Sequence, residues 1–580
     1  MAKNKQNNLM RNSLIQLGLG LLIIILANII GSYWFTRFDL TSEKRYSLSP
    51  VTKNLLKEID DIVYFQVYLD GEFPAGFKRL RNATKEMLDE FRAYNKNIQY
   101  EFVNPSASDN EQERNDTYQL LVEKGLQPTD LKVNTKEGLE QQIIFPGAIV
   151  TYKSNELPVE LLNSQIGVDP EDVLNNSVQA LEFRLASAIR ELTVIMKPSV
   201  AFVRGHGELD NREIYDIGQA LSKQYSVSVV SIGGQLNSLT KRDSVSSDKT
   251  RIINKFDAII IAKPDSAFSE KDKFIIDQFI MRGGKVLWLI DPVFASMDSL
   301  QRATETLGIG LDLNLEDMLF RYGVRLNANL IMDLNALSIP LRTGQVGNQP
   351  QIDFFPWYYF PVITPSENHP IVRNLNAIKT EFISSIDTIK VAGVKKTILL
   401  RSSPYSRTVN APALITLAIL EQEPDERAYT GPQQPVAVLL EGELRSIFEN
   451  RIPPEISTSR DIGFIPKSEP TKMIVVADGD IIRNQLHFSQ GYPLPLGYDQ
   501  YTRQSFGNKD FILNALDYLI DESGLISIRS REVKLRQLDM PRVTKNKIFW
   551  QAFNVILPVI FVILFGIIRY YLRKRKYTGI

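Results

Sequence analysis

Two long segments without charge, one near each end of the chain, constrain this sequence most. Residues 12–36 hold no charged side chain over 25 positions. A helix of that length covers about 37 Å, against a bilayer hydrocarbon core of about 30 Å. The second segment, residues 548–568, is uncharged over 21 positions and lies between Lys547 and Arg569. A cleavable signal peptide is the alternative for the first segment. The apolar region of a signal peptide is only about 7–15 residues long and is followed by a small-x-small cleavage site, whereas this segment is longer and shows no such site. We therefore predict two transmembrane helices.

Basic residues beside these segments bear on their orientation. Two spans place both termini on the same side of the membrane. Neither tail contains an acid, three basic residues precede the first span and five follow the second, which favours cytoplasmic termini. The opposite flank of the second span nearly cancels this bias, because it carries Lys534, Arg536, Arg542, Lys545 and Lys547.

Between the spans, the first part of the chain alternates strands and helices. The predicted strands are residues 62–69, 98–103, 143–151 and 156–162, and the predicted helices are residues 78–95, 111–124 and 174–193. This βαβαββα order is typical of a thioredoxin-like domain. The chain has no Cys, so such a domain cannot carry a thiol redox site.

From Pro198 the pattern changes to short, buried strands separated by helices, which predicts a doubly wound α/β sheet. Its expected strands are residues 199–204, 226–231, 257–262, 285–290 and 473–478, with helices at 211–224, 269–282 and 508–521. Residues 320–470 are interpreted as a continuation or insertion rich in Pro and aromatic residues. Its aromatic run, residues 354–359, is either a partner-binding patch or an irregular loop packed on the core.

These patterns divide the chain into four parts. Residues 1–37 form the first tail and span, and residues 38–196 form the thioredoxin-like domain. Residues 197–530 form the doubly wound domain with its insertion, and residues 531–580 hold a linker, the second span and a basic tail.

Composition and missing motifs exclude several classes of function. Lys plus Arg and Asp plus Glu both number 67, so no bulk charge attracts nucleic acid. Zero Cys and three His make a metal site improbable, and we expect no metal and no cofactor. The P-loop pattern, the G-x-S-x-G elbow and the H-E-x-x-H helix are all absent.

One cluster of polar residues stands where a buried strand should pass into a helix. It runs Arg204-Gly205-His206-Gly207-Glu208, and Asp291, Asp478 and Asp480 follow other predicted strands. Ligands gather at the carboxyl ends of strands in open α/β sheets, so these residues could form one polar cleft. The structural alternative, which we favour, is that the glycines serve a turn, His206 satisfies a buried group and the acids cap helices or turns.

Several longer motifs resemble a known family. They are FDLTSEKRYSLSP (38–50), FVRGHGELD (202–210), LWLIDP (287–292), VVADGDIIRNQ (475–485) and GNKDFILNALDYLIDESGLISIRSR (507–531). Together with the two terminal spans they resemble the GldG family, the auxiliary or substrate-binding subunits of ABC-type transporters associated with gliding motility.

The resemblance implies a periplasmic body of about residues 37–547 on two inner-membrane helices, with both termini cytoplasmic. It also implies a multi-span permease and a separate ATPase as partners, and a link to gliding and protein secretion. The implied fold is similar to class I glutamine amidotransferases and to a domain of intraflagellar-transport proteins. Glutaminase chemistry needs a Cys nucleophile, which this chain lacks.

Three functions follow from these observations. The first is a membrane-anchored, non-catalytic accessory subunit that binds a partner or ligand while another chain hydrolyses ATP. The second is a membrane receptor for carbohydrate or peptidoglycan that uses the 204–208 rim. The third is a hydrolase that uses His206, Glu208 and Asp291.

Overall fold

The computed structural model describes residues 15, 17–26, 47–135, 138–194, 196–246, 249–347, 349–521, 523–530 and 544–577. The chain divides into two units, one that holds the body within residues 46–531 and one that holds the C-terminal helix.

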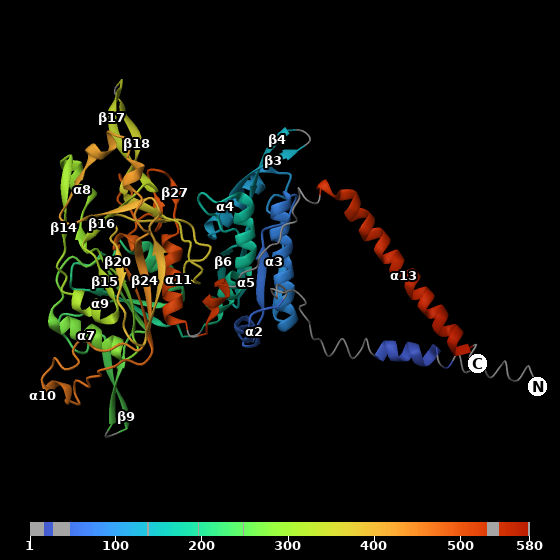
Figure 1. Cartoon of the computed structure of the whole chain (residues 1–580), viewed down its shortest axis with the longest axis horizontal. Coiled ribbons are helices and arrows are strands. Elements are labelled where there is room, and N and C mark those ends of the chain that lie inside the picture. The colour runs from blue at the N-terminus through green and yellow to red at the C-terminus, as the bar shows by residue number, and fades with distance from the viewer. Residues whose placement is uncertain are drawn as a thin grey trace, which may run out of the picture. The chain divides into compact units, whose positions relative to one another are not determined.

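The N-terminal part of the body is built on a four-stranded sheet with the order β2-β1-β5-β6 (Figure 1). Strand β1 runs parallel to β2 and antiparallel to β5, and β6 is antiparallel to β5. The strands are β1 (Val63–Val67), β2 (Ile98–Phe102), β5 (Gly147–Tyr152) and β6 (Asn155–Glu160), and the helices are α2 (Pro50–Lys57), α3 (Ala75–Tyr94), α4 (Glu111–Glu123) and α5 (Pro170–Thr193). The order of these elements is the expected βαβαββα order, preceded by α2.

Two details of this part differ from the prediction. A hairpin of β3 (Thr129–Thr135) and β4 (Gly138–Ile144) was missed, and the strand predicted at 143–151 merges the end of β4 with β5. Helix α5 begins four residues before the predicted start, because Asp169 caps its N-terminus and Pro170 takes the first helical position.

The larger part of the body is a seven-stranded sheet with the order β21-β24-β25-β12-β11-β7-β8. Five neighbouring strands are parallel, and β24 runs antiparallel to both β25 and β21. The strands are β7 (Ser199–Arg204), β8 (Ser226–Ser231), β11 (Ala258–Ala262), β12 (Lys285–Leu289), β21 (Val394–Arg401), β24 (Pro435–Gly442) and β25 (Thr471–Val476).

Helices cover both faces of this sheet, as the buried strands predict. Helices α6 (Tyr215–Gln224) and α11 (Asn508–Ile520) pack on one face, around Phe202, Ile260 and Leu287. Helices α7 (Glu270–Met281) and α9 (Glu316–Tyr322) pack on the other, around Trp288 (Figure 1). Successive strand residues therefore enter opposite cores, which is why the strands are continuously apolar.

The segment predicted as an insertion at 320–470 is more regular than expected. Its strands β21 and β24 extend the main sheet, and the others form small sheets beside it. These are β15 (Val324–Leu326) with β20 (Ile386–Thr388), β16 (Asn329–Asp333) with β22 (Ser406–Asn410), and β17 (Ala336–Val346) with β18 (Gln349–Ile363) and β19 (Ile378–Lys379). A further small sheet joins β13 (Val293–Phe294), β14 (Glu305–Gly310) and β23 (Ala413–Thr416).

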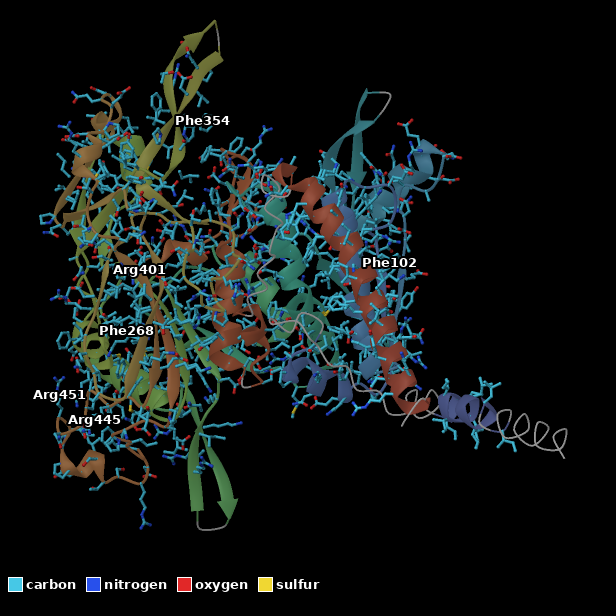
Figure 2. The ribbon with its side chains drawn as sticks, turned by 45° about the vertical axis from the view of Figure 1, so that its right-hand side comes forward. Phe102, Phe268, Phe354, Arg401, Arg445 and Arg451 are labelled. Carbon is cyan, nitrogen blue, oxygen red and sulfur yellow. The ribbon has the colours of Figure 1, made fainter. Side chains whose placement is uncertain are left out.

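The aromatic run lies in strand β18, so the interpretation of this run as an irregular loop is wrong. Trp357, Tyr358 and Tyr359 are buried, whereas Phe354 is exposed on the projecting β17–β18 hairpin (Figure 2). Pro356, the one proline of the run, pairs with Ser338 beside a register shift, where the ladder is already interrupted.

The C-terminal helix α13 (Lys547–Tyr577) carries the second predicted span. Its segment Lys547–Leu572 is 26 residues long with a mean hydropathy of 2.4, and none of its apolar window is buried. Among the described residues it is the one helix long and apolar enough to cross a membrane. Most of the first predicted span lies outside the described residues, and its described part is an apolar helix at Leu17–Leu26.

Candidate functional site

The carboxyl ends of four neighbouring parallel strands carry most of the predicted site residues. Arg204 is the last residue of β7, and Lys263 comes directly after β11. Asp291 and Asp478 each lie two residues past the end of a strand, β12 and β25 respectively. Strand order β25-β12-β11-β7 places these strand ends side by side. The hydrogen bonds and ion pairs of the described residues then sort the charged groups into two clusters rather than one cleft.

The first, the histidine cluster, consists of His206, Glu208 and Asp272. His206 Nδ1 lies 3.2 Å from Glu208 Oε1, and His206 Nε2 lies 3.2 Å from Asp272 Oδ2. The His206 backbone N–H also donates to Glu208 Oε2 at 2.8 Å, and its ring stacks on Phe268 with centroids 3.7 Å apart. The histidine side chain is only 5 % exposed, so a ligand has little access to it.

Hydrogen bonds favour the charged form of this histidine. Burial opposes its protonation, but the hydrogen bonds to Glu208 and Asp272 outweigh burial and raise the pKa of His206. Burial also acts against ionised Asp272, yet donors from Ser269, the Gly234 backbone and His206 lower the pKa of that carboxyl. The cluster is thus an ion-paired link between the loop after β7 and the first turn of α7.

The flanking glycines serve this link. Gly205 and Gly207 have φ of 125° and 74°, conformations that favour glycine. The carbonyl oxygen of His206 accepts from the backbone N–H groups of Asp265 and Ser266 at 2.9 and 3.1 Å. The GHG motif therefore joins the β7–α6 loop to the β11–α7 loop.

The second, the lysine cluster, consists of Lys263, Asp291, Asp478, Asp480 and Arg483. Lys263 Nζ lies 2.8 Å from Asp291 Oδ2 and also pairs closely with Asp480. Arg483 Nε lies 3.0 Å from Asp480 Oδ1. Asp478 accepts from the backbone N–H of Asp480 at 2.8 Å and from that of Glu381 at 3.2 Å.

The protonation preferences within this cluster differ by environment. Burial would raise the pKa of Asp480, but Lys263 and Arg483 outweigh burial and lower it. Burial raises the pKa of Asp291 despite the adjacent ammonium. Burial, and then the charges of Asp291 and Asp480, raise the pKa of Asp478 well above its usual range. Asp478 is therefore the carboxyl that most favours the protonated form.

Carboxylate oxygens of Asp291, Asp478 and Asp480 all lie within 4.8 Å of one another, a spacing that could hold a cation. The ammonium of Lys263 already contacts two of these carboxylates. The chain itself thus supplies the positive charge, and the geometry matches a buried ion network better than a metal centre.

A cavity of about 500 Å³ adjoins the lysine cluster. Arg483 and Glu381 line it and pair with each other at 3.3 Å, so Arg483 connects the buried carboxylates with this cavity. The rest of the lining combines apolar side chains of β17 and β18 with polar ones, including Leu337, Ile339, Phe360, Gln485, Asp499, Gln500 and Tyr501.

The structure accounts for the predicted residues unevenly. Arg204 lies outside both clusters and contacts Asn211 at 3.3 Å. Asp272, Lys263, Glu381 and Arg483 were missed as site residues. The Ser269-x-x-Asp272 capping pattern and the basic residue within VVADGDIIRNQ were the available signals for two of them.

Comparison with known proteins assigns the larger α/β part of the chain to a family. A family model described as "ABC-type uncharacterized transport system" matches residues 197–515. The chain belongs to this ABC-transporter auxiliary family. A second model, described as a domain of unknown function, matches residues 42–151.

One relative and one solved structure are also similar. An uncharacterized protein of Borreliella burgdorferi is 20% identical over 581 residues, which cover 99% of each chain. A structure titled "mmIFT52 N-terminal domain" is 12% identical and covers 56% of this chain and 98% of its own, with a TM-score of 0.30. At that TM-score the likeness carries no argument. The family identifies this chain as an auxiliary component of an ABC-type transport system.

Proposed function

We propose that this protein is a membrane-anchored, non-catalytic accessory subunit of an ABC-type transporter of the GldG kind, associated with gliding motility and protein secretion. The match of residues 197–515 to the auxiliary family carries this proposal. A multi-span permease and a separate ATPase are its proposed partners, because the sequence lacks a P-loop and must use energy released elsewhere.

The proposed topology is two-pass, in the inner membrane. Helix α13 supports one span, since its apolar segment Lys547–Leu572 is 26 residues long and so exceeds the roughly 20 residues needed to cross a bilayer. Trp550, Tyr570 and Tyr571 lie near its two ends, where interfacial aromatics concentrate. We further propose that residues 12–36 form the other span, that both termini are cytoplasmic and that the body is periplasmic.

The proposed domains follow the two main sheets. Residues 38–196 form a thioredoxin-like domain without redox chemistry, and residues 197–530 form a doubly wound, amidotransferase-like domain without a Cys nucleophile. Leu525 and Ile528 nevertheless pack in the core of the N-terminal sheet, so the end of the second domain also stabilises the first. Residues 1–37 and 531–580 hold the anchors.

Co-purification from membranes tests the accessory role. The tagged full-length chain should retain the permease and the ATPase in mild detergent. Val562→Arg places a charge in the middle of α13, at a cost of about 2.5–3.5 kcal/mol for membrane insertion, and the tagged variant should no longer retain either partner. Val562→Leu is the matched control and should behave like wild type. If the wild-type chain purifies alone, the accessory role fails.

Protease accessibility tests the orientation. In spheroplasts, external protease should cut the body between residues 47 and 530, while tags at both termini stay protected. Cleavage of the body only after the membrane is permeabilised would contradict the periplasmic location.

A second candidate function is binding of carbohydrate or peptidoglycan, which the 500 Å³ cavity beside Arg483 favours. The cavity offers carboxylates, amides and the half-exposed Tyr501, groups suited to sugar hydroxyls and rings. Tyr501→Ala should weaken binding of saccharide and muropeptide probes in calorimetry, with complex assembly intact. If His206→Ala loses binding and Tyr501→Ala does not, the binding site is the 204–208 rim instead of the cavity.

The hydrolase interpretation gains no support from the geometry. Both ring nitrogens of His206 face carboxylates of Glu208 and Asp272, and Asp291 pairs with Lys263 in the other cluster. His206, Glu208 and Asp291 are therefore not assembled around a common point of attack.

A further inference from the structure

The two outer edges of the seven-stranded sheet differ in charge. The edge strand β21 has the sequence VKKTILLR, with three basic residues, and Lys395 on it is 74% exposed. The opposite edge strand, β8, has the sequence SVSVVS and carries no charge and no proline. Charged residues and prolines on edge strands are the usual protection against pairing with another chain.

The smaller sheet is protected at both edges. Its edge strand β2 includes Glu101, and β6 includes Glu156, Pro158 and Glu160. Of the four outer edges of these two sheets, β8 is thus the unprotected one. Val229, at its centre, is 52% exposed.

The backbone of β8 presents a regular set of groups to this open edge. Ser226 and Ile232 donate their N–H groups to Pro198 and Arg204 on the β7 side, at 2.8 and 3.4 Å. Backbone direction alternates along a strand, so Val227, Val229 and Ser231 direct their N–H and C=O groups outward. Within the described part of the chain, β7 is the only strand that pairs with β8.

We propose that β8 pairs with β8 of a second copy of this chain, antiparallel, about a two-fold axis at Val229. In this register Val229 faces Val229 of the second copy, and Val227 faces Ser231. All three positions are the outward ones, so each forms a hydrogen-bonded antiparallel pair and the two sheets become continuous. The strand suits a copy of itself because it carries no charge that a two-fold axis would set against its equal.

The cysteine-free sequence makes the register directly testable. Val229→Cys gives the full-length protein a single thiol, which should lie about 5.5 Å Cα to Cα from its equivalent. A short bifunctional thiol reagent applied to membranes should yield a product of twice the 65.9 kDa chain mass. Lys395→Cys on the protected edge is the matched control and should yield little product. Equal yields from both variants, or a product of another mass, would overturn the proposal.

Charge pairing distinguishes direct β8 contact from a loss of folding. Two differently tagged full-length copies should co-purify, and Val229→Lys in both copies should weaken this association about fivefold, since like charges directly opposite each other repel. Val229→Glu in both copies should do the same. A Val229→Lys copy should pair with a Val229→Glu copy at least as well as wild type pairs with itself.

The conservative variant Val229→Thr should leave association unchanged. If the mixed Lys and Glu copies do not recover association, position 229 does not face itself and the two-fold register is wrong. If neither single charge weakens association, the contact between copies does not use β8.

Discussion

The histidine cluster and the lysine cluster lie at the carboxyl ends of the same sheet, but they neutralise buried carboxylates in different ways. In the first, one histidine lies between Glu208 and Asp272, and its charge depends on a proton. In the second, Lys263 is a permanent cation, because Asp291 and Asp480 outweigh burial and raise its pKa. The comparison teaches that one part of this edge is sensitive to pH near neutrality, while the lysine remains charged throughout that range.

The largest effect should come from removing the permanent cation. Lys263→Met leaves Asp291 and Asp480 buried without their shared ammonium, and should lower the free energy of unfolding by about 3–5 kcal/mol. Urea unfolding of the full-length chain in mild detergent measures this loss. Lys271→Met, at an exposed position, is the control and should stay within about 0.5 kcal/mol of wild type. A loss no larger for Lys263→Met than for the control would mean that Lys263 stabilises the fold no more than an exposed lysine does.

The lysine cluster also depends on a close backbone approach. A Cβ on Gly479 would lie 2.6 Å from Lys263 Cβ and 2.9 Å from Lys263 Cα. Gly479→Ala should therefore displace this lysine and cost about 1–3 kcal/mol in the same unfolding measurement. Gly218→Ala, within helix α6 and with open space at its Cβ, is the control and should be neutral or stabilising by up to about 1 kcal/mol. Equal behaviour of the two variants would refute the close-packing argument.

The histidine cluster should make stability depend on pH. Because the pKa of His206 is raised in the folded state, its contribution is fully present below the unfolded pKa of about 6.5 and is lost as pH rises through the folded pKa. The stability difference between wild type and His206→Gln should shrink over that range, by about 1.4 kcal/mol per unit of pKa shift. His487→Gln retains His206 and should keep the wild-type slope. A pH-independent difference would mean that His206 acts through packing alone.

The smallest effect should come from the serine that supports the histidine cluster. Ser269 caps α7 and donates to Asp272 Oδ2 at 2.7 Å, so Ser269→Ala removes a cap and loosens the carboxylate that holds His206. We expect a loss of about 1–2 kcal/mol. Ser296→Ala removes only the cap of the short helix α8 (Met297–Arg302) and should cost about 0.5–1 kcal/mol. Urea unfolding measures both losses. A larger loss for Ser296→Ala than for Ser269→Ala would mean that Ser269 does not stabilise the histidine cluster.

The buried strands and capped helices could be predicted because their signals are local. Strands β7, β11 and β12 agree with their predicted ranges to within one residue, since each is a short apolar run between turns. The β3–β4 hairpin was missed because most of its residues are polar, so no apolar period marks it. The roles of β21 and β24 were missed because the strands that they pair with, β24 for β21 and β25 for β24, each lie tens of residues further along the chain.

The site was predictable only in part. His206, Glu208, Asp291, Asp478 and Asp480 were singled out from strand ends, but their grouping was not. Lys263 follows β11 as an ordinary surface lysine would, and nothing in its neighbours along the chain indicates two buried carboxylates. Its partners come from residues 28 and 217 positions away (291 − 263 and 480 − 263).

The sequence alone determined the lipid-compatible length of the C-terminal helix, the absence of thiol chemistry and the alternation of buried strands with helices. These three features depend only on the type of each side chain and on its spacing from near neighbours along the chain, both of which can be taken directly from the sequence. Only the tertiary structure decided which carboxylates share a cation, which strands lie at the sheet edges and which of those edges lacks charge. Coulombic and hydrogen-bond energies depend on distance in space, and strand order, rather than separation along the chain, sets that distance.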